Sequence, residues 1–133
     1  MSITIEQAQK GIQAGLEKAA QLNSPSSIAI LDEGRNLVAF ARMDGALLAS
    51  VALSQAKAFT ARSMNMKTGD LLPLVQPGAP LYGLEIAHTP PLVVFGGGQP
   101  LTVGEKVIGA VGVAGGMVPD DEAVAAAVAA AIS

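Results

Sequence analysis

The single histidine of the chain, His88, is the residue best suited to bind a metal. A neutral imidazole is a common protein ligand of haem iron. His88 lies in the longest irregular stretch, residues 76–91, beside Pro90 and Pro91, where a ligand could reach it. The alternative is a loop histidine that makes ordinary hydrogen bonds. Because the chain has no cysteine, a zinc site would lack its usual further ligands.

Three cations are placed to meet an anion. Arg42 ends a predicted strand, Lys57 lies within an otherwise aliphatic helical segment, and Arg62 follows five residues later. Arginine and lysine bind carboxylates through charge-assisted hydrogen bonds, so a small carboxylic acid or the propionates of haem would both fit. The alternative pairs Arg42 or Lys57 with a carboxylate, Asp32 or Asp44, as a structural ion pair.

A glycine run and a lone tyrosine are further candidates for ligand contact. Gly96, Gly97 and Gly98 could present backbone N–H groups to an anion. They could equally serve only the backbone angles of a tight turn, and their spacing matches no nucleotide-binding fingerprint. Tyr82 could donate a hydrogen bond to a ligand or cover the core with its ring.

The elements that must position these residues are predicted from hydrophobic spacing and from turn residues. The first helix is expected from Thr4, which begins a capping box, to about residue 23, and two strands follow at 27–31 and 37–43. A helix is then expected at 46–64 and a short helix, capped by Thr68, at 72–75. The last elements are a strand at 92–95, a glycine turn at 96–100, a strand at 107–114 and a helix from Pro119. Asp120, Asp121 and Glu122 fall at the positive end of that last helix, which explains them without a metal.

The order of these elements predicts the fold class. Strands that follow one another through turns pair antiparallel, and helices between them must cover the faces of the sheet. We therefore expect an α/β (α+β) protein with an antiparallel sheet of about five strands. A chain of 133 residues, of which 50% are hydrophobic, predicts a single domain over residues 1–133 with an aliphatic core.

The composition also limits the partners. A net charge of −3 and an aromatic fraction of 3% argue against nucleic-acid binding. No apolar run approaches the roughly 20 residues of a membrane helix, and residues 1–10 do not resemble an export signal, so we expect a cytoplasmic protein without a membrane partner. The mean hydropathy of +0.46 predicts a homo-oligomer, a dimer or larger, that buries apolar surface between subunits. The alternative is an unusually alanine-rich core.

A set of short motifs extends over nearly the whole chain. They are Leu31–Gly34, Leu37–Ala46, Lys57–Ala61, Tyr82–Leu84, Gly96–Pro100, Val107–Gly116 and Asp120–Asp121. Taken in order, they resemble the GlcG/HbpS-like haem-degrading-domain family, which is related to the C-terminal domain of PduO-type cobalamin enzymes. The resemblance implies a profilin-like sheet with helices on its faces, assembly into dimers or larger rings, and, for several members, binding of haem or a related tetrapyrrole.

These observations predict a small-ligand-binding protein whose ligand is haem or a related tetrapyrrole. The expected site is a concave region between the 76–91 loop, the end of the second strand and the glycine turn. Arg42, Lys57, Tyr82 and His88 would converge there, with His88 as the possible iron ligand. The alternatives are a small enzyme that acts on an organic-acid or aromatic metabolite through Lys57, Arg42 and the loop, and an accessory protein without a ligand. The sequence leaves open whether the protein is catalytic.

Overall fold

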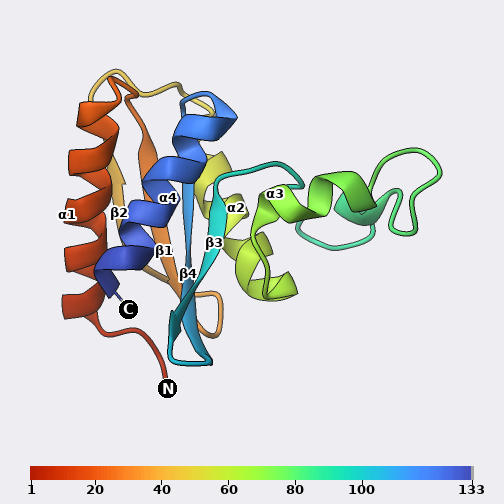
Figure 1. Cartoon of the computed structure of the whole chain (residues 1–133), viewed down its shortest axis with the longest axis horizontal. Coiled ribbons are helices and arrows are strands. Elements are labelled where there is room, and N and C mark those ends of the chain that lie inside the picture. The colour runs from red at the N-terminus through yellow and green to blue at the C-terminus, as the bar shows by residue number, and fades with distance from the viewer. Residues whose placement is uncertain (133) are drawn as a thin grey trace.

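The computed structural model describes residues 1–132, which form a four-stranded antiparallel sheet with helices on both faces (Figure 1). The elements are α1 (Ile5–Gln21), β1 (Ser27–Asp32), β2 (Leu37–Arg42), α2 (Ser50–Met64), α3 (Thr68–Leu71), the 3₁₀ turns η1 (Leu72–Leu74) and η2 (Leu84–Ile86), β3 (Gly98–Val103), β4 (Lys106–Ala114) and α4 (Val118–Ile132). The strand order is β2-β1-β4-β3. No described helix is both long and apolar enough to cross a membrane.

The sheet has four strands in the described chain rather than about five, and the difference lies before β4. The glycine turn predicted at 96–100 is wrong, because its second half begins β3. Pro100 is tolerated there since β3 is an edge strand that pairs with β4 alone. The strand predicted at 92–95 is also wrong: the Val93 N–H donates to Thr60 Oγ1 at 2.9 Å instead of joining a ladder.

Two helix starts also differ from expectation. The helix predicted from residue 46 begins at Ser50, because residues 46–47 are irregular and residues 48–49 form a turn before it. Thr68 does not cap the short helix that follows. Its Oγ1 instead accepts a hydrogen bond from the Gly98 N–H at 2.9 Å, which ties the start of α3 to β3.

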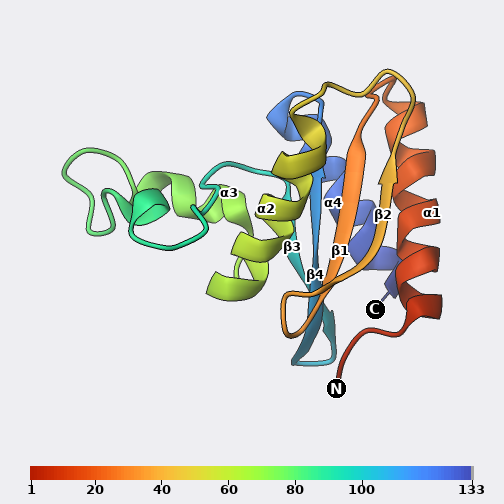
Figure 2. The same cartoon turned by 180° about the vertical axis from the view of Figure 1, so that it is seen from behind.

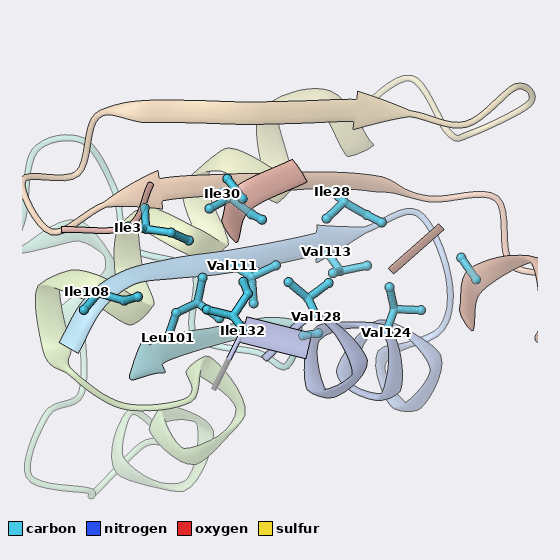
Figure 3. Close-up of a cluster of buried hydrophobic side chains, with 13 residues drawn as sticks. Ile3, Ile28, Ile30, Leu101, Ile108, Val111, Val113, Val124, Val128 and Ile132 are labelled. Atoms are coloured by element: carbon cyan, nitrogen blue, oxygen red, sulfur yellow. The ribbon is translucent and has the colours of Figure 1, made fainter. Parts of the chain in front are cut away.

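The first face of the sheet is covered by α1 and α4, which also pack against each other (Figure 1). The predicted capping box is confirmed: Thr4 Oγ1 accepts from the Gln7 N–H at 3.1 Å, and the Thr4 N–H donates to Gln7 Oε1 at 2.9 Å. Gly11 and Gly15 bring the helices close, because a Cβ at either would press into Val128. The core on this face is aliphatic and fully buried (Figure 3), and includes Ile28, Ile30, Leu101, Ile108, Val111, Val113, Val124 and Val128.

The second face is covered by α2 alone, which lies over β4 and reaches β1 and β3 (Figure 2). Gly112 of β4 permits the close approach, because a Cβ there would collide with the Ser54 carbonyl oxygen of α2. Among the described elements, α1 is the helix that packs on β2, and it does so from the first face. The edge strand β2 is therefore left without a helix on the α2 side.

Residues 72–91, here called the arm, project from the body between α3 and β3 (Figures 1 and 2). The arm contains the whole irregular stretch predicted at 76–91, and η1 and η2 are its short helical turns. Several of its large apolar side chains are exposed: Leu72, Leu81, Tyr82 and Ile86. The arm returns to the body beside α2, where the His88 ring packs on Phe59 of that helix.

Candidate functional site

A groove of about 480 Å³ lies on the second face, where α2 leaves β2 uncovered. Its floor comes from β1 and β2, one wall from α2, one end from the β1–β2 turn, and its rim from the returning arm. The lining residues are Leu31, Arg35, Asn36, Leu37, Gln55, Ala56, Phe59 and Pro90. The groove is mostly apolar, and it holds one cation and no carboxylate among its described lining residues, which is a composition suited to a flat apolar ligand.

Strand register explains why the floor is apolar and open. Side chains alternate along β1, so Ile30 enters the α1/α4 core while Leu31 faces α2. Leu37 pairs with Leu31 across the hairpin, next to an irregularity in the register, and shares its face. Leu31 is buried under α2, whereas Leu37 is 52% exposed. The exposed leucine follows directly from the absence of a helix over β2 on this side.

His88 contacts two residues that line the groove. Its ring packs edge-to-face on Phe59, with centroids 5.7 Å apart and planes at 71°. Its Nδ1 lies 3.1 Å from the carbonyl oxygen of Pro90. A carbonyl oxygen can only accept, so in the neutral ring Nδ1 carries the proton and Nε2 keeps its lone pair. This is the tautomer in which Nε2 can bind a metal, and second-shell carbonyls commonly hold metal-binding histidines in this way.

Lys57 does not line the groove. It is 1% exposed, and its Nζ donates to the Val113 carbonyl at 2.8 Å and to Asp121 Oδ2 at 3.1 Å. Burial lowers the pKa of Lys57 and raises the pKa of Asp121, while the attraction between the two charges opposes both changes. The sequence suggested Asp32 or Asp44 as the ion-pair partner of Lys57. The structure shows that the partner is Asp121. Lys57 thus joins α2 to the end of β4 and the start of α4.

The other predicted site residues are placed apart. Arg42 is exposed at the end of β2, and Tyr82 is 68% exposed on the arm. Lys57 is buried, and Tyr82 borders two small cavities that neither Arg42 nor Lys57 lines, so these three residues do not meet at any of the five cavities described for residues 1–132. The ligand roles of Arg42 and Tyr82 stay predictions.

The glycine run lies around Lys57 rather than at the groove. Gly97 has φ +128°, and a Cβ there would come within 2.7 Å of Lys57 Nζ. The N–H of Gly98 is already used by Thr68, and the Glu122 carboxylate packs against Gly96. A separate cavity of about 230 Å³ borders Gly97 and Gly98. The run makes room for the buried lysine, and anion binding by Gly96, Gly97 and Gly98 stays a prediction.

Sequence reasoning missed three residues that the structure makes prominent. Arg35 and Phe59 line the groove, and Asp121 neutralises Lys57. A signal existed for Asp121, because a lysine inside an aliphatic helix needs a buried partner, but the acidic run at 120–122 had already been assigned to the start of the last helix. Nothing local distinguished Arg35 from other turn residues, since its position depends on α2, which lies far along the chain.

The fold and the groove define a class of protein: an antiparallel sheet covered by helices, with an apolar groove beside one edge strand. Residues 3–130 match the family model described as Haem degrading protein HbpS-like. The chain belongs to this family. The resemblance to the GlcG/HbpS-like proteins, predicted from the motifs, is confirmed.

Curated relatives share much of the chain. An uncharacterized 15.0 kDa protein from the dhaT-dhaS intergenic region of Citrobacter freundii is 42% identical over 124 residues, which cover 93% of this chain and 87% of that protein. Corrinoid adenosyltransferase PduO of Citrobacter freundii is 37% identical over 133 residues, all of this chain but 40% of that enzyme's length. Protein GlcG of Escherichia coli strain K12 is 36% identical over 102 residues, which cover 77% of this chain and 73% of GlcG.

A solved structure of a relative contains a ligand. The crystal structure of PduOC in complex with haem superposes on this chain with a TM-score of 0.95 at 37% sequence identity. The superposition covers 100% of this chain and 96% of that one.

Proposed function

We propose that this protein binds haem or a related tetrapyrrole in the groove between β2 and α2. The observation that carries the proposal is the state of His88, whose Nδ1 donates to the Pro90 carbonyl at 3.1 Å beside an apolar groove of about 480 Å³. That hydrogen bond leaves Nε2 as the nitrogen that can bind iron. The haem complex of the related PduOC supports the same ligand class.

The residues that line the groove also suit a tetrapyrrole in polarity. Leu31, Leu37 and Phe59 offer apolar and aromatic surface for the macrocycle, and Gln55 adds a neutral polar group. Haem would supply the iron centre, and the chain would supply the apolar surface and one imidazole. The groove lining contains no carboxylate, serine or threonine among the described residues, so no observation favours the alternative of an enzyme with acid–base or nucleophilic groups at this site.

An absorbance titration with haemin tests the proposal. The wild-type protein should show a saturable Soret shift typical of nitrogen ligation, and His88→Ala should lose that shift. Thr89→Ala, a change at the exposed neighbouring residue, should keep it. Iron-free protoporphyrin IX should bind wild type and His88→Ala equally, because the variant retains the apolar groove.

Two outcomes would contradict this assignment. A Soret band that is unchanged in His88→Ala would remove His88 as the iron ligand. A wild-type protein without any saturable spectral change, for haemin and for protoporphyrin IX alike, would overturn the tetrapyrrole proposal as a whole.

We also propose that the protein forms a homo-oligomer through the arm. Tyr82 is 68% exposed and Ile86 is 83% exposed, and both belong to the arm, which stands away from the body (Figure 2). Glu85 is the only acidic residue of the arm, and the arm has no lysine or arginine. Two copies can therefore meet through this surface without strong like-charge repulsion, which favours a second copy as the occupant.

Light scattering tests the oligomer. The wild-type mass should be a multiple of 13.3 kDa, and the double variant Tyr82→Ser/Ile86→Ser should shift the mass toward a single chain. Leu48→Ser is the matched control, because Leu48 is 88% exposed in the turn before α2 and is not part of the arm. A wild-type mass near 13.3 kDa at micromolar concentration would overturn this proposal.

A further inference from the structure

Arg35 holds its guanidinium group at one end of the groove. The residue lies in the β1–β2 turn, and its Cζ is 4.5 Å from the centroid of the Phe59 ring. Its Nη1 donates to Ser63 Oγ at 3.2 Å. Both contacts are to α2, so the side chain crosses from the hairpin to the helix that forms the groove wall. The guanidinium group is thereby oriented on an aromatic surface.

Arg35 has no carboxylate partner among the described residues. The ion pairs that the structure describes join the N-terminus to Glu33 and Lys57 to Asp121. The other acid of the turn, Asp32, uses Oδ1 to accept from the backbone N–H groups of Gly34 and Asn36, both at 2.9 Å. The two acids nearest in sequence are therefore engaged elsewhere, in a chain whose net charge is −3.

The backbone of the β1–β2 turn fixes the position of Arg35. Arg35 has φ +69°, a left-handed conformation that residues with a Cβ adopt at a cost. The Asp32 side chain bonds the backbone on both sides of Arg35, and the Arg35 N–H donates to the Asp32 carbonyl at 3.0 Å. The turn is thus held by its own hydrogen bonds, and the Arg35 side chain is not needed to close it.

We propose that Arg35 is the carboxylate anchor of the groove and binds a propionate of the tetrapyrrole. The assignment rests on the function proposed above. A guanidinium group has five N–H donors in a planar fork, and Ser63 accepts from Nη1 alone in the described contacts. A carboxylate can take two of the remaining donors in a bidentate pair. Arg35 and His88 both contact the ring of Phe59, so a ligand held by both would have a single preferred orientation.

The experiment compares a carboxylic acid with its neutral counterpart. Binding of haemin and of haemin dimethyl ester is measured by titration for wild type, Arg35→Gln, Arg35→Lys and Lys106→Gln. Lys106→Gln is the control, because Lys106 is also an exposed cation but lies at the start of β4, outside the groove lining. Arg35→Gln should weaken haemin binding about tenfold to a hundredfold, the range for lost charge-assisted hydrogen bonds, and should leave the ester unchanged.

The pattern across the variants decides the assignment. Arg35→Lys should recover part of the preference for the acid, since it keeps the charge but not the fork. Equal weakening of acid and ester in Arg35→Gln would mean that Arg35 only shapes the groove, and no weakening would mean that it does not contact the ligand. Either result overturns the anchor. Thermal melts followed by circular dichroism verify that the variants are folded.

A second probe separates this inference from the proposed function. Pyrenebutyrate and pyrenebutanol share an apolar aromatic body and differ in the carboxylate. If the protein binds no haemin but binds pyrenebutyrate more tightly than pyrenebutanol, and Arg35→Gln abolishes the difference, the anchor holds and the tetrapyrrole function fails. If wild type binds haemin but binds neither haemin nor pyrenebutyrate more tightly than its neutral counterpart, the proposed function holds and the anchor fails.

Discussion

The two faces of the sheet carry the same kind of secondary structure but differ in how completely helices cover them. On the first face, α1 and α4 lie side by side over a core of buried aliphatic residues. On the second face, α2 lies alone over β4, with the buried Lys57–Asp121 pair at one end and the open groove on the other side. The comparison separates the surface that stabilises the fold from the surface that is available to a ligand.

The difference arises from the width of the sheet and the number of helices. Two close-packed helices span about 20 Å, roughly the width of a four-stranded sheet, whereas one helix spans about half of it. Because Gly112 draws α2 onto β4, the uncovered strip falls on the edge strand β2. A chain with one helix on a four-stranded face therefore has a groove unless another molecule or segment covers it.

The largest change in the free energy of unfolding is expected when the buried Lys57–Asp121 pair of the second face is broken. Lys57→Met removes the partner of Asp121 and leaves a buried carboxylate without its cation, which should lower the free energy of unfolding by about 3–5 kcal/mol. The double variant Lys57→Met/Asp121→Asn should recover part of that loss, because neither residue is then charged. Urea denaturation measures all three proteins.

The control for this change is Lys10→Met, at an exposed lysine of α1, which should have little effect on unfolding. If the double variant is less stable than Lys57→Met alone, the hydrogen bond that Asp121 Oδ1 accepts from the Gly116 N–H, rather than charge neutralisation, dominates at this position. The Lys57–Asp121 pair would then stabilise the fold through its hydrogen bonds more than through its charges.

The next prediction compares one aliphatic residue from each face. Ile30 is fully buried under α1 and α4, so Ile30→Ala should lower the free energy of unfolding by about 2–5 kcal/mol. Leu37 is 52% exposed in the groove, so Leu37→Ala should change it by no more than about 0.5 kcal/mol. Leu37→Ala should instead weaken haemin binding. Similar losses of stability in both variants would mean that the groove is closed in solution.

The smallest change in the free energy of unfolding is expected in the β1–β2 turn, which contains Arg35. The backbone N–H of Asn36 donates to the Asp32 carboxylate and holds the pKa of Asp32 below its usual value, despite the opposing effect of partial burial. A carboxyl group with a lowered pKa in the folded state stabilises the fold above its unfolded pKa, and this contribution is lost as the pH falls through the folded pKa. Asp32→Asn should therefore cost less than about 1 kcal/mol at neutral pH.

The difference between wild type and Asp32→Asn should shrink below about pH 4, where the wild-type carboxyl group takes up its proton. Thermal melts from pH 2 to pH 7 measure this, and Asp44→Asn in the exposed turn after β2 serves as the control. A gap that stays constant across this range would show that the turn depends on the shape of residue 32 and not on its charge.

Local patterns in the sequence predicted the elements whose signals are contained in a few neighbouring residues. The capping box at Thr4, the hairpin of β1 and β2 and the strand ending at Ala114 are confirmed, because each depends on local hydrogen bonds or on alternation within one segment. The motifs also identified the family correctly. The strand at 98–103 was missed because glycine and proline usually signal a turn, and only its edge position makes Pro100 acceptable.

The candidate site was decided by tertiary structure. The sequence shows that Lys57 is a cation in an apolar helix, but its partner Asp121 is 64 residues away and meets it only because α4 starts where β4 ends. The groove likewise depends on which strand lies at the edge and where α2 packs, and neither is encoded in the spacing of nearby residues. Arg35 and Phe59 become neighbours through that packing, so the site could be recognised only when the sheet, α2 and the returning arm were seen together.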